Sequence, residues 1–387
     1  MPTNFDTPIE RRGTDSIKWA EYGDDVLPLW VADLDFRSPE PIIQALVERV
    51  EHGVFGYPKA STELAEVVRE RLATRHHLPV RTEDIYFLPN LGTALNVVTR
   101  TVGEPGDGVL MPTPIYPPFL NAVNYAGRVL NDAEMTRVEN GSLVRYELDF
   151  DALEAAVTPR TRLLMFSNPH NPVGRVYTRV DLERLADIAL RHDLILCSDE
   201  VHGDLIFDGQ HVSLATLAPE VSRRCVTLLA PSKTFNIAGL ECGIIVTENS
   251  ELMARMKAVA QGIVPFVTAM AYTAATAAYL HGQPWLDELL PYLRANRETV
   301  VDFVRTRLPA VKTTCPEATY LAWLDCRALN LPESPFSYFL REAKVAFVDG
   351  ATFGKGGEGF VRLNFGTQRA TLLEALERVA RSLEGTH

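Results

Sequence analysis

Four polar or aromatic side chains stand where short apolar runs of the sequence give way to turn residues. The runs and the residues that follow them are 107–111 with Tyr116, 162–166 with Asn171, 194–198 with Asp199, and 225–229 with Lys233. A lysine amine can form a Schiff base with a carbonyl compound. A carboxylate, an amide and an aromatic ring are groups that can hold and tune an electron-withdrawing ring beside it. Taken alone, Lys233 is a surface loop lysine, Asn171 a turn residue and Asp199 a helix cap, so the fold must decide.

The apolar runs predict buried strands, because they are short, rich in aliphatic residues and bounded by turn residues. A helix is predicted between two of them, with Thr178 as its N-cap and Asp181 three residues later. Its apolar face consists of Leu182, Leu185, Ala186 and Ala189. Strand–helix–strand alternation indicates a mostly parallel sheet that is covered on both faces. Ligands bind at the carboxyl ends of such strands, so the four side chains should face one crevice.

An anion site is predicted upstream, where Gly92 and Thr93 begin a helix. Free backbone N–H groups and the helix dipole attract a phosphate there, although a plain cap is the ordinary explanation for such a pair. The ordered set of phosphate site, aromatic ring, amide, carboxylate and lysine matches the needs of pyridoxal 5′-phosphate (PLP). We therefore expect PLP as the cofactor.

The chain resembles the fold-type I PLP-dependent enzymes of the class I/II aminotransferase superfamily. More closely it resembles the C–S β-lyases of the cystathionine β-lyase (PatB/MalY) branch. The segments that carry the resemblance, in family order, are LPLWVADLDF (27–36), FGYP (55–58), PGDGVL (105–110), TPIYPPF (113–119), NPHNPVG (168–174), SDEVHGDLIF (198–207), SKTFNIAGL (232–240), TYLAWLD (319–325) and GFVRLNF (359–365). The resemblance implies a PLP-dependent transferase-like α/β fold. It has a large domain built on a mixed, mostly parallel sheet flanked by helices, and a smaller α+β domain.

The resemblance also implies roles at the cofactor ring. Lys233 matches the lysine that forms the Schiff base and acts as base on the substrate's Cα. Asp199 matches the partner of the pyridine nitrogen, and Tyr116 the residue that stacks on the ring. Asn171 and His202 match the positions that contact the phenolic oxygen or support the ring.

Further positions follow from the same resemblance. It assigns the phosphate to Leu91, Gly92, Thr93 and Ser232. Tyr57 matches a tyrosine that reaches the phosphate of the neighbouring subunit, which implies an obligate homodimer. The expected catalytic residues are Lys233, Tyr57 and Tyr116. Arg362 would clamp the substrate's α-carboxylate, with Ala32 and Asn171 also against the substrate.

Two positions depart from the aminotransferase pattern. Many superfamily members have Ser or Thr three residues before the lysine, where this chain has Ala230. Many aminotransferases have a phosphate-binding Arg eight residues after the lysine, where this chain has Glu241. A carboxylate cannot bind a phosphate dianion, so we expect Glu241 to point away or to meet a cation. These departures favour the lyase branch.

Three hypotheses for function follow. The first is β-elimination from cystathionine or an S-substituted cysteine, giving a thiol, pyruvate and ammonia. The alternative is an aminotransferase acting on an L-amino acid with the same residues. The third is a non-catalytic regulator with this fold, which would not need the whole set of site residues.

Three other sequence features say less about the function. The stretch GKGGEG (354–359) spells a dinucleotide fingerprint, but a strand-like segment follows it where a helix is required. Glu200, His202 and Asp204 lack a metal-binding pattern, and no metal is expected. His76 and His77 are predicted to lie at a solvated helix end.

Composition sets the broad class. The 387 residues are 46% hydrophobic and carry a formal net charge of −12 without a long basic cluster, which argues against nucleic acid and anionic membrane as partners. Five scattered cysteines and the absence of a signal-peptide pattern or a membrane-spanning stretch lead us to expect a cytoplasmic protein.

Two domains are expected. Residues 46–285 form the large PLP-binding domain, and residues 1–45 with 286–387 form the small one. The small domain should contain a long helix over 284–308, broken or kinked near Pro291, strands at 319–325, 345–350 and 359–365, and a final helix over 370–384.

Overall fold

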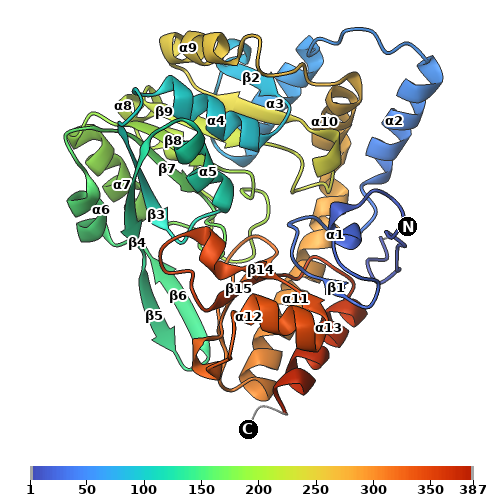
Figure 1. The fold of residues 1–387 in the computed structure, drawn as a ribbon. Coiled ribbons are helices and arrows are strands. Elements are labelled where there is room, and N and C mark those ends of the chain that lie inside the picture. Colours follow the sequence, from blue (N-terminus) through green and yellow to red (C-terminus); the bar gives the residue numbers. More distant parts are fainter. Residues whose placement is uncertain (1–2, 385–387) are drawn as a thin grey trace.

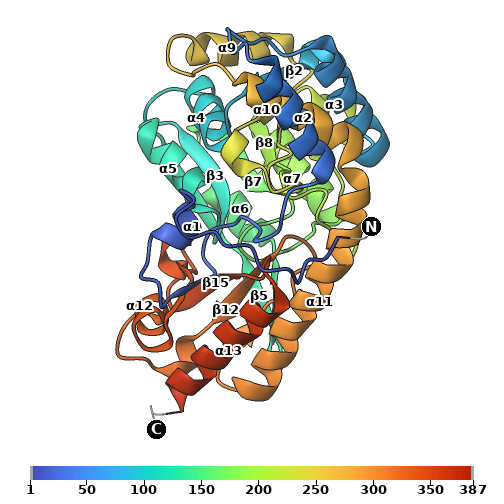
Figure 2. The same ribbon diagram turned by 90° about the vertical axis from the view of Figure 1, so that its right-hand side faces the viewer.

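The computed structural model describes residues 3–384 as two sheets surrounded by helices (Figure 1). The larger sheet lies in the upper half of that view and the smaller in the lower half. The N-terminal segment, drawn in dark blue, runs between the two halves in both views (Figures 1 and 2). None of the described helices is long and apolar enough to span a bilayer.

The large sheet has seven strands. Their spatial order is β2 (Ile85–Leu88), β10 (Gly243–Val246), β9 (Cys225–Leu229), β8 (Ile195–Asp199), β7 (Thr161–Ser167), β3 (Gly108–Thr113) and β4 (Val129–Glu134). The strands from β9 to β4 pair in parallel, whereas β10 is antiparallel to both its neighbours. Every residue of β3 and β9 is buried, which is why these strands read as continuous apolar runs. The predicted mixed, mostly parallel sheet is confirmed.

Helices cover both faces of this sheet. One face packs on α4 (Leu91–Thr101), α5 (Pro117–Tyr125) and α9 (Ser250–Ala260), and the other on α6 (Phe150–Ala156), α7 (Arg179–Arg191) and α8 (Pro219–Ser222). Successive residues of β3 serve opposite cores, Val109 and Met111 on the first face and Leu110 on the second. The predicted cap of α7 is confirmed, because Thr178 and Asp181 form a reciprocal capping box.

Three further helices lie at the β2 end of the sheet. They are α2 (Glu40–His52), α3 (Thr62–Arg75) and α10 (Ala269–His281). Helix α10 packs against both of the others. The connection between α2 and α3 arches away from the body of the molecule in Figure 1.

The second sheet is mostly antiparallel. Its order is β14 (Val348–Asp349), β15 (Phe360–Asn364), β12 (Leu321–Asp325), β11 (Lys312–Thr313), β6 (Leu143–Glu147) and β5 (Thr136–Asn140). Its core is shared with α11 (Gln283–Arg307), α12 (Pro335–Tyr338) and α13 (Arg369–Leu383), and β13 (Val345–Ala346) pairs with β1 (Leu27–Pro28). The hairpin β5–β6 comes from the middle of the chain, where no strand of this sheet was expected.

The expectation of a break near Pro291 is wrong, whereas the alternative of a kink there stays a prediction. Helix α11 continues through it without interruption. A proline removes one intrahelical hydrogen bond, but Leu289 and Leu293 on either side are fully buried and anchor the helix to the core. Packing therefore holds the helix together where local propensity opposes it.

Candidate active site

A cavity of about 290 Å³ opens at the carboxyl ends of β7, β8 and β9. The predicted residues that line it are Ala32, Leu91, Gly92, Tyr116, Asn171, Asp199, His202, Ser232 and Lys233. Its volume is at the lower edge of the range for small-molecule sites, which begins near 300 Å³. The ends of parallel strands thus bring together residues that lie far apart in the sequence.

Lys233 presents its amine inside this cavity. Its Nζ donates to the backbone oxygen of Ala32 at 2.7 Å. Burial lowers the pKa of Lys233 to about 8, and the positive charge of Arg362 acts in the same direction. The amine can therefore both take up and release a proton near neutral pH.

Asp199 is the last residue of β8 and lines the same cavity. Its Oδ1 accepts the Val201 N–H at 3.1 Å, and within residues 3–384 no cation is paired with it. Burial raises the pKa of Asp199 to about 7, and the neighbouring charge of Glu200 adds to this shift. A protonated ring nitrogen placed here would supply the missing positive charge.

His202 and Tyr116 complete the ring end of the cavity. The His202 ring is buried, its Nδ1 has no partner among the described residues, and burial lowers its pKa to about 3. It is therefore a neutral imidazole. Burial also raises the pKa of the Tyr116 phenol, which keeps that ring neutral.

The other end of the cavity is the N-terminus of α4. Asn90 caps this helix, and its Oδ1 accepts the N–H of Thr93 at 2.9 Å and its hydroxyl at 3.1 Å. Thr93 does not line the cavity, whereas Leu91 and Gly92 do. Ser232 lines the cavity as well, and the assignment of a phosphate to Leu91, Gly92, Thr93 and Ser232 stays a prediction.

Glu241 neither points away nor meets a cation. It lines the same cavity, and its Oε1 accepts the Asn90 Nδ2 amide at 3.1 Å. The part of the chain that the structure describes offers it no ion pair. A negative charge thus stands beside the expected phosphate end.

Arg362 lies on β15, behind the cavity wall. Its Nη1 donates to Asn171 Oδ1 and its Nη2 to Trp30 O, both at 3.1 Å, while Nε has no partner among residues 3–384. The guanidinium sits between the rings of Tyr116 and Phe353, at 5.9 and 5.2 Å from their centres. Burial lowers the pKa of Arg362 to about 10, so it remains a cation at neutral pH.

Tyr57 lies apart from the other predicted residues. It belongs to the connection between α2 and α3, is 97% exposed and does not line this chain's cavity. Its nearest aromatic neighbour is Phe266, at 6.3 Å between ring centres. Within a single subunit, Tyr57 therefore lies outside the cavity that contains Lys233.

Pyridoxal phosphate fits this donor set. A helix N-terminus and a serine stand at one end, a buried carboxylate without a cation at the other, and a free amine and an aromatic ring between them. The phosphate, the ring nitrogen and the aldehyde of PLP need these three kinds of partner.

Sequence reasoning missed two features around the site. Tyr320, which is fully buried, donates its hydroxyl to the same Ala32 oxygen at 3.0 Å, a contact that no motif announces. His76 is not solvated but buried, at 5.3 Å from the His211 ring and close to Glu200. Glu200 Oε1 accepts from Ser198, Ser213 and the Leu214 N–H, and Oε2 lies 3.0 Å from His211 Nε2, so this carboxylate is held by hydrogen bonds.

Comparison with known proteins gives a consistent result. The model of the family "Aminotransferase class I and II" matches residues 24–379. Cystathionine beta-lyase PatB of Bacillus subtilis (strain 168) is 40% identical, over 98% of this chain and 100% of its own length. The crystal structure of OvoB superimposes with a TM-score of 0.94 at 43% identity, covering 99% of this chain and 100% of that one. Cystalysin from Treponema denticola, whose crystal structure contains PLP, superimposes with a TM-score of 0.94 at 32% identity over all of both chains.

Proposed function

Because the chain belongs to the class I and II aminotransferase family, we propose that it is a PLP-dependent C–S β-lyase. Its substrate is cystathionine or another S-substituted cysteine, and its products are a thiol, pyruvate and ammonia. The observation that carries the proposal is the placement of Lys233. Its amine, with a pKa of about 8, stands in a cavity that has a helix N-terminus at one end and the Asp199 carboxylate at the other.

PLP, when bound, supplies an aldehyde that joins amines and a ring that withdraws electrons from the substrate's Cα. The residues of this chain bind, orient and move protons around it. Leu91, Gly92, Thr93 and Ser232 would hold the phosphate, with the α4 dipole in support. Asp199 would pair with the ring nitrogen, whose positive charge would offset the burial that raises the pKa of this carboxyl.

Substrate binding depends on Arg362. A carboxylate can accept from Nε and share the Nη donors that now contact Asn171 and Trp30. This clamp fixes the α-carbon relative to the Lys233 amine, which is catalysis by positioning.

Proton transfer depends on Lys233. Its neutral amine removes the proton from Cα and becomes an ammonium that donates to the Ala32 oxygen. The C–S bond then breaks, and the sulfur leaves with the bonding electrons and takes up a proton as a thiol. The remaining three-carbon enamine reacts with water to give pyruvate and ammonia.

The test is an assay of purified protein with PLP and L-cystathionine in the absence of a 2-oxo acid. We expect pyruvate and thiol in equal amounts, and no turnover by Lys233→Ala. Turnover that begins only when 2-oxoglutarate is added, with formation of glutamate, establishes an aminotransferase instead. Failure of the protein to develop cofactor absorbance favours the non-catalytic regulator.

The active unit we propose is a homodimer in which Tyr57 of each subunit reaches the phosphate in the other. Its support is the exposed apolar surface around Tyr57, made of Val54, Phe55, Ile263 and Phe266. Large exposed apolar patches mark association sites. A cytoplasmic location is proposed as well, since all five cysteines are free thiols.

A further inference from the structure

The backbone of residues 30–36, here named the strap, is held along its length by side chains from both halves of the molecule. Lys233 donates to the carbonyl of Ala32, and Asn236 donates to the carbonyls of Leu34 and Phe36. Arg362 donates to the carbonyl of Trp30, and Asn364 donates to the carbonyls of Val31 and Asp33. The remaining donors are Tyr320 to Ala32, Arg11 to Leu34 and Gln368 to Asp35. Lys233 and Asn236 belong to the loop after β9, whereas Arg362 and Asn364 belong to β15. The strap therefore joins the amine to the carboxylate clamp.

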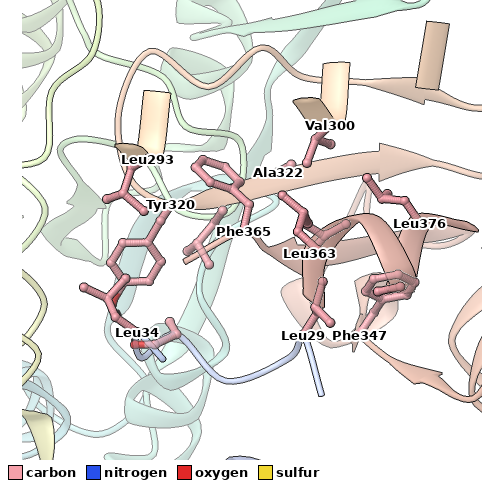
Figure 3. Close-up of a cluster of buried hydrophobic side chains, with 14 of the residues drawn as sticks. Leu29, Leu34, Leu293, Val300, Tyr320, Ala322, Phe347, Leu363, Phe365 and Leu376 are labelled. Carbon is pink, nitrogen blue, oxygen red and sulfur yellow. Dashed lines mark hydrogen bonds between the residues drawn. The ribbon is translucent and has the colours of Figure 1, made fainter. Parts of the chain in front are cut away.

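The flanks of the strap are seated in the core of the second sheet. Leu29 and Leu34 pack there with Tyr320, Leu363 and Phe365 (Figure 3). This apolar contact fixes where the strap lies, and the Tyr320 hydroxyl supplies one of the two donors on the Ala32 carbonyl, the other being Lys233.

A buried ion cluster joins residues of the N-terminal segment to Asp35 of the strap. Lys18 and Asp35 are 1% and 2% exposed, and Lys18 Nζ lies 2.7 Å from Asp35 Oδ2. The remaining Asp35 oxygen, Oδ1, accepts from Arg11 at 2.6 Å and from Trp19 Nε1 at 2.9 Å. Burial alone would raise the pKa of Asp35, but Lys18 and Arg11 hold it below its ordinary value. Asp35 is therefore a carboxylate at neutral pH.

We propose that Lys18 and Asp35 are positioning residues for Lys233: their ion pair locks the strap so that the Ala32 carbonyl stays on the amine. The pair acts at a distance, because neither residue lines the cavity. Breaking a buried ion pair leaves an uncompensated charge that the surrounding backbone must move to accommodate. The part of the backbone next to Asp35 is the strap.

The proposal predicts a change in the proton affinity of Lys233. A carbonyl that accepts from an ammonium favours the charged form, so its withdrawal lowers the pKa of the amine. The charged and titratable groups that face Lys233 are Asp33 from the strap, Asp199 and His202 from β8 and the residues after it, and Arg362 from β15, with Tyr116 and Glu241 on the cavity wall. Of these groups Lys18→Met touches only Asp33, whose Oδ1 lies 3.4 Å from Lys18 Nζ and which keeps its ion pair with Arg11. Because the charge of Asp33 raises the pKa of Lys233, the loss of this contact acts against a shift of the midpoint to lower pH.

The experiment follows cofactor capture by the apoenzyme, in which the Lys233 amine joins the PLP aldehyde with loss of one water. Capture needs the neutral amine, so the absorbance change is measured as a rate across pH. In Lys18→Met we expect the midpoint to move to lower pH by about half a unit to one unit. The control is Arg297→Met, which removes a buried guanidinium that pairs with the half-exposed Asp208, and neither residue lines the cavity. It should lower the melting temperature and leave the midpoint in place.

A second variant keeps the test decisive if Lys18→Met does not fold. Trp19→Phe removes one neutral donor from Asp35 and no charge, and should move the midpoint in the same direction by less. An unchanged midpoint in the folded variants, whatever their stability, overturns the proposal. The inference rests on the cofactor role of Lys233 within the proposed function, yet capture requires no substrate. A negative lyase assay and an unchanged midpoint are therefore separate results.

Discussion

At the scale of single residues, the clamp on the substrate depends on one buried guanidinium. Arg362 has two Nη donors engaged, Nε free, and an aromatic ring on each side. Lysine offers neither the fork of donors nor the flat face. We expect Arg362→Lys to raise KM for cystathionine about tenfold to a hundredfold, because a hydrogen bond to a charged group contributes about 1.5–3 kcal/mol.

The control for this prediction is Arg307→Lys. Arg307 forms a half-exposed ion pair with Glu377 between α11 and α13 and should leave KM unchanged. Steady-state kinetics with both variants decides, and an Arg362→Lys enzyme with the KM of the parent would remove Arg362 from substrate binding.

A second residue-scale prediction concerns pH. The pKa of the free Lys233 amine is about 8, and the profile of kcat reports groups in the substrate complex, in which Lys233 would act as a free amine. Only the neutral amine can accept the Cα proton. We expect kcat to rise with pH up to about 8 and to fall about tenfold for each pH unit below this value. A kcat that is constant between pH 6 and 9 would mean that proton removal by Lys233 does not limit the reaction.

At the scale of elements, the loop that carries Lys233 is anchored through Asp204. Arg71 of α3 lies 2.8 Å from Asp204 Oδ1, and Thr234, next to Lys233, donates to Oδ2 at 3.2 Å. Although burial opposes it, the charge of Arg71 holds the pKa of Asp204 well below its ordinary value. This carboxylate therefore ties together α3, the end of β8 and the lysine loop.

Asp204→Asn should lower the free energy of unfolding at pH 7 by about 3 kcal/mol, the order expected for breaking a buried pair. Because the folded-state pKa is depressed, the stabilisation by Asp204 is fully present above the ordinary pKa and is lost as pH falls below about 4. The difference between parent and variant should therefore narrow below that pH. Urea unfolding at pH 7, 5 and 3.5 measures it, and a gap that stays constant would contradict the assignment.

The elements also show which parts of the structure a sequence can predict. Strands β3, β7, β8 and β9 were predictable, because a strand that is buried on both faces has a continuous apolar sequence. Asp199 and Lys233 could then be predicted as site residues, since Asp199 directly follows the run 194–198 and Lys233 lies in the loop after 225–229. The continuity of α11 through Pro291 was not predictable from local propensity, because distant core residues hold the helix together.

At the scale of the whole molecule, the contacts that join the two halves had no signal in the sequence. The Ala32 oxygen accepts from Lys233 and Tyr320, which lie 201 and 288 residues away. A backbone acceptor carries no residue identity, so no motif marks it. For the same reason the contacts of the strap could not be predicted, although its sequence belongs to a segment that carries the family resemblance.

The last prediction concerns an active site shared between two subunits. Lys233 lines this chain's own cavity, whereas Tyr57 is 97% exposed outside it. If each site combines Lys233 of one subunit with Tyr57 of its partner, Lys233→Ala removes the lysine from the subunit's own site. Tyr57→Ala instead removes the tyrosine from the partner's site. A mixed dimer of the two then contains one site with both native residues.

Coexpression of the two variants should therefore restore activity that neither has when expressed alone. Random pairing gives about half mixed dimers, each with one intact site of two, so about a quarter of the sites become native. Light scattering establishes the dimer, and the lyase assay measures the recovery. Lys233→Ala coexpressed with a second Lys233→Ala chain is the control. Activity no higher than the sum of the separate variants would place Tyr57 outside the partner's site, and the exposed surface around it would then need another explanation.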